Sequence, residues 1–238
     1  MGSPGRRRGD SRNEGACLAL SDIDPAAAQA VASEIRKQGG TATVIEADVT
    51  DAASVERMTK AASDSMGGLD VLVTCAGGYT AYARFEDIDE RDWDRMIALN
   101  LKSVYLCCRA VLPYMRRRGF GRIINLGSLA GRSSSAGTSP AHYGAAKVAV
   151  SMLTQYVAKD VAAFGITANT VAPGTTATDR VEKLLTPEKR KTFIQATPVG
   201  CLAQPDDIVG VITFLASDES RYITGATIDV NGGRLMVL

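Results

Sequence analysis

The 238-residue sequence has almost no net charge, because 27 Lys and Arg residues balance 26 Asp and Glu residues. Without an excess of either sign there is no field to attract nucleic acid or an anionic membrane. No apolar run approaches the length of about twenty residues that a membrane span needs. We therefore expect neither nucleic acid nor a membrane among the partners of the chain.

The first sixteen residues, MGSPGRRRGDSRNEGA, lack the apolar segment of a secretory signal. Gly2 alone suggests myristoylation, but Arg6 stands where that signal needs Ser or Thr. The polar composition of residues 1–16 predicts a disordered tail.

Cysteine is scarce and has no characteristic spacing: the five residues are odd in number and form no CxxC pair. This pattern argues against a disulfide framework and against a zinc site, and we expect no metal. It predicts buried thiols in a reducing compartment, so we expect a cytoplasmic protein. With 45% hydrophobic and 22% charged residues, the remaining segment 17–238 is long enough for a single domain with a substantial core.

Apolar strands and amphipathic helices alternate from Cys17 to the C-terminus. Strands are expected at 17–22, 43–47, 69–74, 123–126, 166–171 and 226–230. Helices are expected at 25–38, 53–66, 91–118, 143–164, 187–195 and 204–215. This alternation predicts an α/β fold, a doubly wound parallel sheet of Rossmann type with right-handed crossovers. The run 69–74 (LDVLVT) is continuous enough to predict a strand buried on both faces.

The most informative stretch is residues 121–147, GRIINLGSLAGRSSSAGTSPAHYGAAK, in which Ser128 follows a strand and Tyr143 opens a helix. Lys147 lies four residues after Tyr143, so the two side chains share one face of that helix. A cation near a phenol favours the phenolate and lowers its pKa towards neutrality, which suits an acid or base. By itself, a Tyr and a Lys four residues apart occur by chance about once in every few chains of this length.

Further motifs in order and spacing give these residues a context. They are Asp48 and Val49 after a strand, Ala76 and Gly77 after LDVLVT, Asn100 in ALNLKSVYL, and Pro173, Gly174, Thr176 and Thr178 in VAPGTTATD. Together with Ser128 and the Tyr-x-x-x-Lys pair, they make the chain resemble the classical short-chain dehydrogenases/reductases, a family that includes 3-oxoacyl-acyl-carrier-protein reductases. The resemblance covers about nine tenths of the chain, from Gly15 to the end.

The resemblance implies hydride exchange between a nicotinamide cofactor, NAD or NADP, and a carbonyl compound or secondary alcohol. It implies that Tyr143 passes the proton to or from the substrate oxygen and that Ser128 orients this oxygen. It also implies that Lys147 lowers the pKa of Tyr143 and holds the nicotinamide ribose, and that Asn100 supports a water relay. The implied cofactor contacts are Asp48, Val49, Ala76, Gly77, Tyr143, Lys147, Pro173, Gly174, Thr176 and Thr178. Taken singly, each has an ordinary structural explanation as a cap, a turn or a loop residue.

Three finer expectations follow. Asp22 ends a strand where a carboxylate accepts hydrogen bonds from the ribose hydroxyls and repels a 2'-phosphate, and no Arg follows it, so NAD is favoured over NADP. The resemblance suggests a 3-oxoacyl thioester as substrate, with the loop 79–85 and a lid at 175–200 shaping the pocket. Apolar residues around the helices 91–118 and 143–164 suggest a homo-oligomer, a dimer or tetramer.

The sequence departs from the family pattern in several places. Thr74 and Cys75 replace two asparagines, Gly127 replaces a serine, and the loop 132–140 is slightly long. The family's first strand and Gly-rich loop have no counterpart: Gly5, Gly9 and Ser11 imitate the loop but lack the strand and helix around it. We therefore expect a sheet that is incomplete at its N-terminal side, as in a truncated reading, with exposed strand edges. Two alternatives remain open: an oxidoreductase, or a non-catalytic relative that acts only through oligomerisation.

Overall fold

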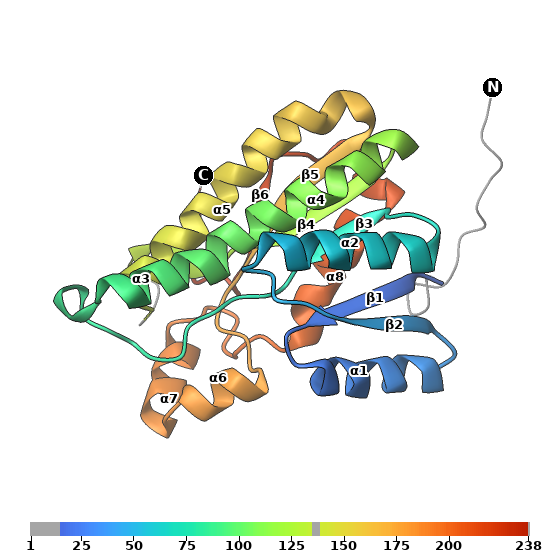
Figure 1. Ribbon diagram of the computed structural model, residues 1–238. Helices are drawn as coiled ribbons and strands as arrows, with labels where there is room; N and C mark the ends of the chain where they lie inside the picture. The colour runs from blue at the N-terminus through green and yellow to red at the C-terminus, as the bar shows by residue number, and fades with distance from the viewer. Residues whose placement is uncertain (1–14, 135–138, 238) are drawn as a thin grey trace.

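The computed structural model describes residues 15–134 and 139–237, and its strands and helices alternate along the chain (Figure 1). The strands are β1 (Cys17–Asp22), β2 (Thr41–Glu46), β3 (Val71–Thr74), β4 (Gly121–Leu126), β5 (Ile166–Pro173) and β6 (Thr227–Val230). The helices are α1 (Pro25–Lys37), α2 (Ala52–Met66), α3 (Glu90–Ile97), α4 (Ser103–Arg118), α5 (Ala141–Val161), α6 (Asp179–Leu184), α7 (Pro187–Gln195) and α8 (Pro205–Ala216).

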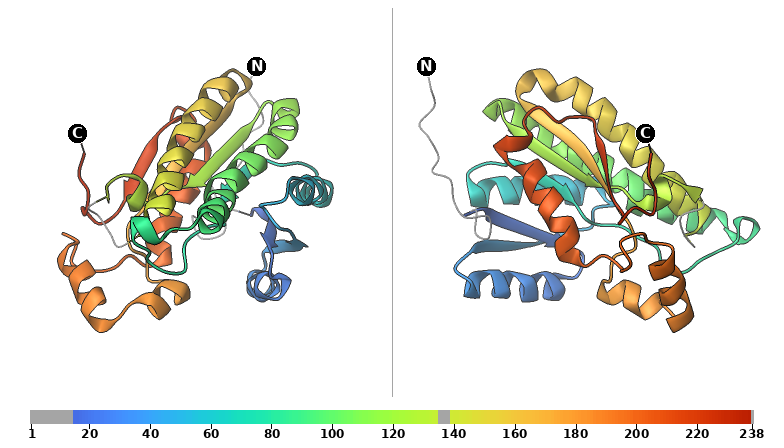
Figure 2. Two further views of the ribbon diagram at one scale, coloured as in Figure 1. Left: turned by 60° about the vertical axis from the view of Figure 1, so that its left-hand side comes forward. Right: turned by 180° about the vertical axis from the view of Figure 1, so that it is seen from behind.

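All strand pairs are parallel, as the alternation of strands and helices predicts. Strands β3, β4, β5 and β6 form one sheet in that order, and β1 and β2 form a second. Helices α4 and α5 lie on one face of the four-stranded sheet and α8 on the other (Figure 2). The expected α/β doubly wound architecture is therefore confirmed, in two pieces.

The break in the sheet falls between β1 and β3, and no described strand is hydrogen-bonded between them. Leu18 on β1 is 38% exposed and Val71 on β3 is 42% exposed. The prediction that the run 69–74 is buried on both faces is wrong, because one edge of β3 has no neighbouring strand within the described residues. The expected incompleteness of the sheet is observed at this place.

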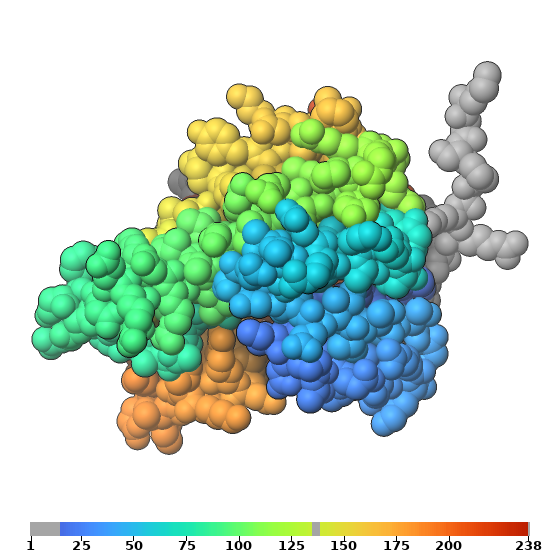
Figure 3. All heavy atoms as spheres, in the orientation of Figure 1, coloured from blue at the N-terminus to red at the C-terminus, as the bar shows by residue number. Residues whose placement is uncertain are grey.

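Helix α2 connects the two parts of the fold. Asp51 caps its first turn through a 2.7 Å hydrogen bond from the Ser54 amide, and Gly67 ends it at a φ of 72°, which suits glycine. The helix contacts β1 and β2 on one side and α4 on the other. In the space-filling view it lies between the blue N-terminal part and the green α4 (Figure 3). Its apolar residues contribute to two clusters, one around Val55 and one that includes Ala62 and extends to α4 and β4.

The expected helix 91–118 is continuous from Glu90 to Arg118 but contains one π turn, Ala98–Lys102. By length and composition it is the one described helix that could cross a membrane. Core helices of soluble proteins pass the same test, and the inner face of α4 packs through Val104, Val111 and Met115 into the main core cluster. The helix is therefore weak evidence for a membrane span.

The expectations on the cysteines and on the N-terminal tail have different outcomes. Of the five cysteines only Cys107 and Cys108 are buried, whereas Cys17, Cys75 and Cys201 are exposed, so the prediction of five buried thiols is wrong. The tail 1–16 and the imitation Gly-rich loop at Gly5, Gly9 and Ser11 lie almost wholly outside the described residues, as does the middle of the loop 132–140, and these expectations stay predictions. The division into a tail and one domain also stays a prediction.

Candidate active site

Ser128, Tyr143 and Lys147 are brought together where β4 ends and α5 begins. Ser128 follows β4 by one residue, with its Oγ accepting a 3.1 Å hydrogen bond from the Ala130 amide. Tyr143 lies in the first turn of α5 and Lys147 in the next, with the Lys147 Nζ 5.8 Å from the centre of the Tyr143 ring. The Ser128 hydroxyl lies near enough to the Tyr143 phenol to lower its pKa. The expected convergence of a hydroxyl, a phenol and a cation is therefore present.

Lys147 is almost completely buried, with 4% of its surface exposed. Its Nζ donates a 2.7 Å hydrogen bond to the carbonyl oxygen of Leu126, the last residue of β4. Burial lowers the pKa of Lys147 to about 8, the Cys75 side chain raises it slightly and the charge of Arg180 lowers it further. The ammonium is thus charged at neutral pH but close to losing its proton.

The pKa of Tyr143 is raised, chiefly because the phenol is buried, and the neighbouring Tyr79 adds to this. The Ser128 hydroxyl and the charge of Arg180 act in the opposite direction. The prediction that Lys147 brings the phenol towards neutrality is wrong for this structure, because desolvation of the phenolate outweighs the nearby charges. At neutral pH the phenol is therefore protonated.

Asn100 has no exposed surface and lies within the π turn of the long helix. Its Oδ1 accepts a 2.7 Å hydrogen bond from the Gly78 amide, and its Nδ2 donates to the Gly78 and Met96 carbonyl oxygens, each at 3.1 Å. The amide therefore fixes both polar groups of Gly78 and has no donor left for a water.

We call the region between the Gly77–Gly78 loop, Tyr143 and Lys147 the crevice, and on its loop side Gly77 and Gly78 leave bare backbone. Their φ angles of 144° and 120° are ones that other residues rarely adopt. A Cβ on Gly77 would lie 2.7 Å from the Asn100 Oδ1 and 3.4 Å from the Lys147 Nζ. This loop, the buried cation and the phenol are suited to a flat ligand with ribose hydroxyls, so the residues present fit a nicotinamide nucleotide. Ala76, at the entrance to this loop, is exposed.

The expected adenosine contacts lie at the ends of the strands of the smaller sheet. Asp22 ends β1, and its Oδ1 accepts a 2.9 Å hydrogen bond from the Asp24 amide. Asp48 follows β2, and Thr50 donates to its Oδ1 from both its amide and its hydroxyl, at 2.8 and 2.7 Å, which lowers the pKa of Asp48. Val49 packs beside the small core cluster of α2 and α4. Both carboxylates are thus held by their own loops.

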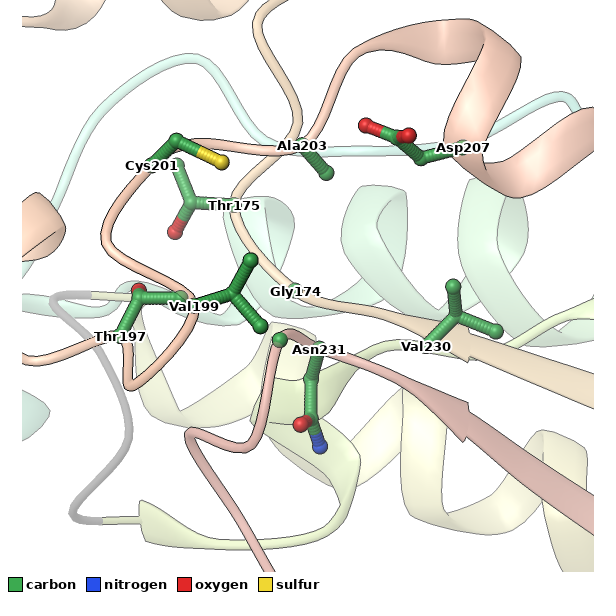
Figure 4. A pocket seen from close by; sticks show the side chains of 10 residues that line it. Gly174, Thr175, Thr197, Val199, Cys201, Ala203, Asp207, Val230 and Asn231 are labelled. Carbon is green, nitrogen blue, oxygen red and sulfur yellow. The ribbon is translucent and has the colours of Figure 1, made fainter.

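The segment after β5 carries the remaining expected contacts. The Gly174 amide donates to the Val230 carbonyl oxygen at 2.9 Å, which continues the pairing of Pro173 with β6. Thr176 donates to the Gly174 carbonyl oxygen at 3.2 Å, and Thr178 caps α6. A pocket of about 140 Å³ opens beside this segment (Figure 4). Gly174 and Thr175 line it together with Cys201, Asp207 and Asn231, whereas Ser128, Tyr143 and Lys147 do not.

One residue of the crevice was missed at the level of sequence. Arg180, the second residue of α6, donates a 3.0 Å hydrogen bond from Nη1 to the Gly77 carbonyl oxygen. No spacing signal connects positions 103 residues apart, and only the folded segment after Thr178 brings the two together. The ring of Tyr79, expected at the pocket rim, lies tilted by 60° against the Tyr143 ring, with 4.9 Å between the ring centres.

Thr74, which stands where the family pattern has asparagine, takes part in a buried polar chain. The Thr74 hydroxyl donates a 2.9 Å hydrogen bond to Asn125 Oδ1, and Asn125 Nδ2 donates to the Thr154 hydroxyl at 2.9 Å. The Thr170 hydroxyl bonds to Thr154 at 3.0 Å. This buried chain joins β3, β4, α5 and β5 under the crevice, so the polar link between the strands is kept.

Comparison with known proteins gives these features a family. A family model described as enoyl-(acyl carrier protein) reductase matches residues 10–234. The chain is 40% identical over 211 residues to a 3-oxoacyl-[acyl-carrier-protein] reductase of Synechocystis, which covers 88% of this chain and 83% of that protein. It is 36% identical over 225 residues to an acetoacetyl-CoA reductase of Allochromatium vinosum, covering 92% and 89%.

Among solved structures, a gluconate 5-dehydrogenase from Burkholderia cenocepacia in complex with NADP and tartrate superimposes with a TM-score of 0.86 at 32% identity. The match covers 92% of this chain and 86% of that one. These relatives are oxidoreductases, so the comparisons give the non-catalytic alternative no support. The chain belongs to the classical short-chain dehydrogenase/reductase family and is an oxidoreductase.

Proposed function

We propose that this chain reduces a carbonyl compound with a nicotinamide cofactor and that Tyr143 supplies the proton. The observation that carries the proposal is the convergence of Ser128, Tyr143 and Lys147 beside the bare backbone of Gly77. The pKa of Tyr143 is raised by burial, so at neutral pH the phenol carries its proton and can act as the proton donor of a reduction.

When bound, the nicotinamide supplies the hydride that attacks the carbonyl carbon. The residues of the chain have complementary tasks. The Ser128 hydroxyl positions the carbonyl oxygen next to the phenol, and the Tyr143 proton moves to that oxygen as negative charge develops on it. The phenolate left on Tyr143 is stabilised by the neighbouring Lys147 ammonium, which also faces the expected position of the ribose.

Asn100 acts on this site by fixing the Gly77–Gly78 backbone. With its side-chain amide committed to Gly78, it keeps the loop in the positive-φ conformation that opens the floor of the crevice. The expected cofactor contacts at Ala76, Pro173, Gly174, Thr176 and Thr178 surround the nicotinamide end in this proposal, and Asp48 and Val49 the adenine end.

For the substrate we propose a 3-oxoacyl thioester. Support comes from the 3-oxoacyl-[acyl-carrier-protein] reductase and acetoacetyl-CoA reductase among the relatives. The rim also suits a long acyl thioester, because Tyr82 and Phe85 are 60% and 75% exposed beside the crevice loop that carries Tyr79. Acetoacetyl-CoA is the simplest probe of this substrate class.

We further propose that NAD is preferred to NADP. The argument rests on Asp22, whose exposed carboxylate at the end of β1 would repel a 2'-phosphate. The Burkholderia relative in complex with NADP does not support this preference. Asp22→Asn should therefore lower the ratio of NADPH to NADH dissociation constants, whereas the control Glu34→Gln, a loss of charge on α1, should leave it unchanged. Equal ratios in all three proteins would exclude a role for Asp22 in the choice of cofactor.

We also propose a cytoplasmic homo-oligomer, a dimer or tetramer. Helices α4 and α5 expose large apolar side chains, with Tyr105 44%, Met152 53% and Tyr156 64% exposed. Such a surface is typical of a face that packs on another subunit. Light scattering on the eluting protein should give a mass of two or four chains, and a mass of one chain would refute the proposal.

The test of the catalytic proposal is Tyr143→Phe, which removes the proton donor and keeps the ring. We expect turnover of acetoacetyl-CoA to fall by about 10² to 10⁴, the usual contribution of a general acid, while NADH still binds. The matched control is Tyr156→Phe on the same helix, whose side chain is 64% exposed. Unchanged turnover in Tyr143→Phe would refute the assignment.

A further inference from the structure

Arg180 is a cation in the crevice without an acidic partner. It leaves the start of α6, reaches the loop after β3, and lies against Gly78 so closely that a Cβ there would collide with its guanidinium. Within the described residues no carboxylate lies within 4.0 Å of any of its nitrogens. Among the described residues its one hydrogen-bond partner is the Gly77 carbonyl oxygen, which accepts from one of its five N–H groups.

The position of the guanidinium is close to the catalytic groups. Its charge is felt at Tyr79, Tyr143 and Lys147, where it lowers each pKa. It therefore faces the volume between the Gly77 loop and the phenol, the volume in which the proposed function places the cofactor. Arg180 lies on α6 and Lys147 on α5, so both of these cations come from the side of the four-stranded sheet.

A nicotinamide dinucleotide carries its negative charge on the diphosphate, halfway along the molecule. In folds of this class the diphosphate usually meets a Gly-rich turn at a helix N-terminus. An arginine is well suited to the same task, because its planar fork can bind two phosphate oxygens at once.

We propose that Arg180 binds the diphosphate of the cofactor and thereby links the α6 segment to the cofactor crevice. This inference rests on the proposed function, since it assumes a nicotinamide dinucleotide in the crevice. Arg180 is a binding residue here, with no part in the proton transfer. On binding, the guanidinium exchanges its single carbonyl partner for phosphate oxygens, which draws α6 over the ligand.

The test uses ADP-ribose, which contains the diphosphate and lacks nicotinamide, and adenosine, which lacks both. By calorimetric titration of the full chain, Arg180→Ala should weaken ADP-ribose binding about ten- to a hundredfold, the usual worth of a charge-assisted hydrogen bond. Adenosine binding should change less than twofold. Arg180→Lys should recover part of the loss, because it keeps the charge and loses the fork.

The matched control is Lys183→Ala, which removes a positive charge from the same helix, where no described contact joins Lys183 to the crevice. It should bind ADP-ribose as tightly as the unmodified chain. Equal ADP-ribose affinity in Arg180→Ala and the unmodified chain would overturn the proposal. If Arg180→Ala also had a higher KM for acidic ketones, Arg180 would be assigned to the substrate. An equal loss for adenosine would also overturn it.

The outcome is separable from that of the proposed function. If ADP-ribose binding depends on Arg180 but the chain never reduces a carbonyl, the proposed function fails and the diphosphate site stands. If the chain reduces acetoacetyl-CoA and Arg180→Ala binds ADP-ribose normally, the proposed function stands and the diphosphate site fails.

Discussion

Replacing Lys147 by Met should make the unliganded chain more stable although it destroys the proposed site. The ammonium is 4% exposed, and among the described residues its one hydrogen-bond partner is the Leu126 carbonyl oxygen at 2.7 Å. Burial lowers its pKa from 10.5 to about 8, which at 1.36 kcal/mol per tenfold change in acidity corresponds to a cost of roughly 3 kcal/mol at pH 7. Methionine has a similar length and no charge to desolvate.

The stability gained by removing the buried charge is reduced by the loss of the hydrogen bond from Lys147 to Leu126. Leaving the Leu126 carbonyl without its donor costs about 1–3 kcal/mol, so we expect the free energy of unfolding of the variant to be higher by up to about 2 kcal/mol at pH 7. The sign of the pH dependence follows from the pKa. Between about 8 and 10.5 the unfolded chain binds more protons at this position than the folded chain, so the cost of Lys147 decreases as the pH rises.

Urea unfolding of both proteins at pH 7 and pH 10 measures this difference. The advantage of Lys147→Met should be present at pH 7 and should vanish or reverse at pH 10, while NADH-dependent turnover is lost at both values. A variant that is less stable at pH 7, or an advantage that does not change with pH, would refute the account of a desolvated ammonium.

Further predictions concern the loop at Gly77 and the thiols. Asn100→Ala should lower the free energy of unfolding by about 2–4 kcal/mol, because it leaves the buried polar groups of Gly78 without partners; a loss below 0.5 kcal/mol in urea unfolding would contradict this. Gly77→Ala should weaken NADH binding at least tenfold in a fluorescence titration, because its Cβ would lie 2.7 Å from Asn100; unchanged affinity would show that the loop relaxes freely. Burial raises the pKa of Cys107 to about 11 and of Cys108 to about 12, so a thiol reagent at pH 8 should modify these two only after unfolding; their modification in the folded chain, located by mass spectrometry, would contradict the packing.

Local sequence signals predicted the elements well where a cap or a breaker marks their ends. Strand β1 and helix α7 have the expected bounds, Cys17–Asp22 and Pro187–Gln195. Asp24 with Pro25 marks the start of the helix that follows β1, and Thr186 with Pro187 marks the start of α7. Strand β5 extends past its expected end to Pro173. The proline ring removes the backbone N–H, and the pairing of β5 does not need an N–H donor at this position.

Properties that depend on the assembled fold were not accessible from the sequence. The exposure of Val71 depends on what lies beside β3, and an apolar run cannot report its neighbours. The pKa of Tyr143 is decided by burial, which the spacing of four residues to Lys147 does not contain. The contact of Arg180 with Gly77 likewise arises only from the packing of the segment after β5.

The central claim is that this chain holds a nicotinamide cofactor in front of Tyr143. Titration of the 238-residue protein with NADH, followed by the enhancement of nicotinamide fluorescence, tests it without any assumption about the substrate. The account predicts saturable binding at one site per chain, reversed by excess NAD. A fluorescence signal that rises linearly to millimolar NADH without saturation would contradict it.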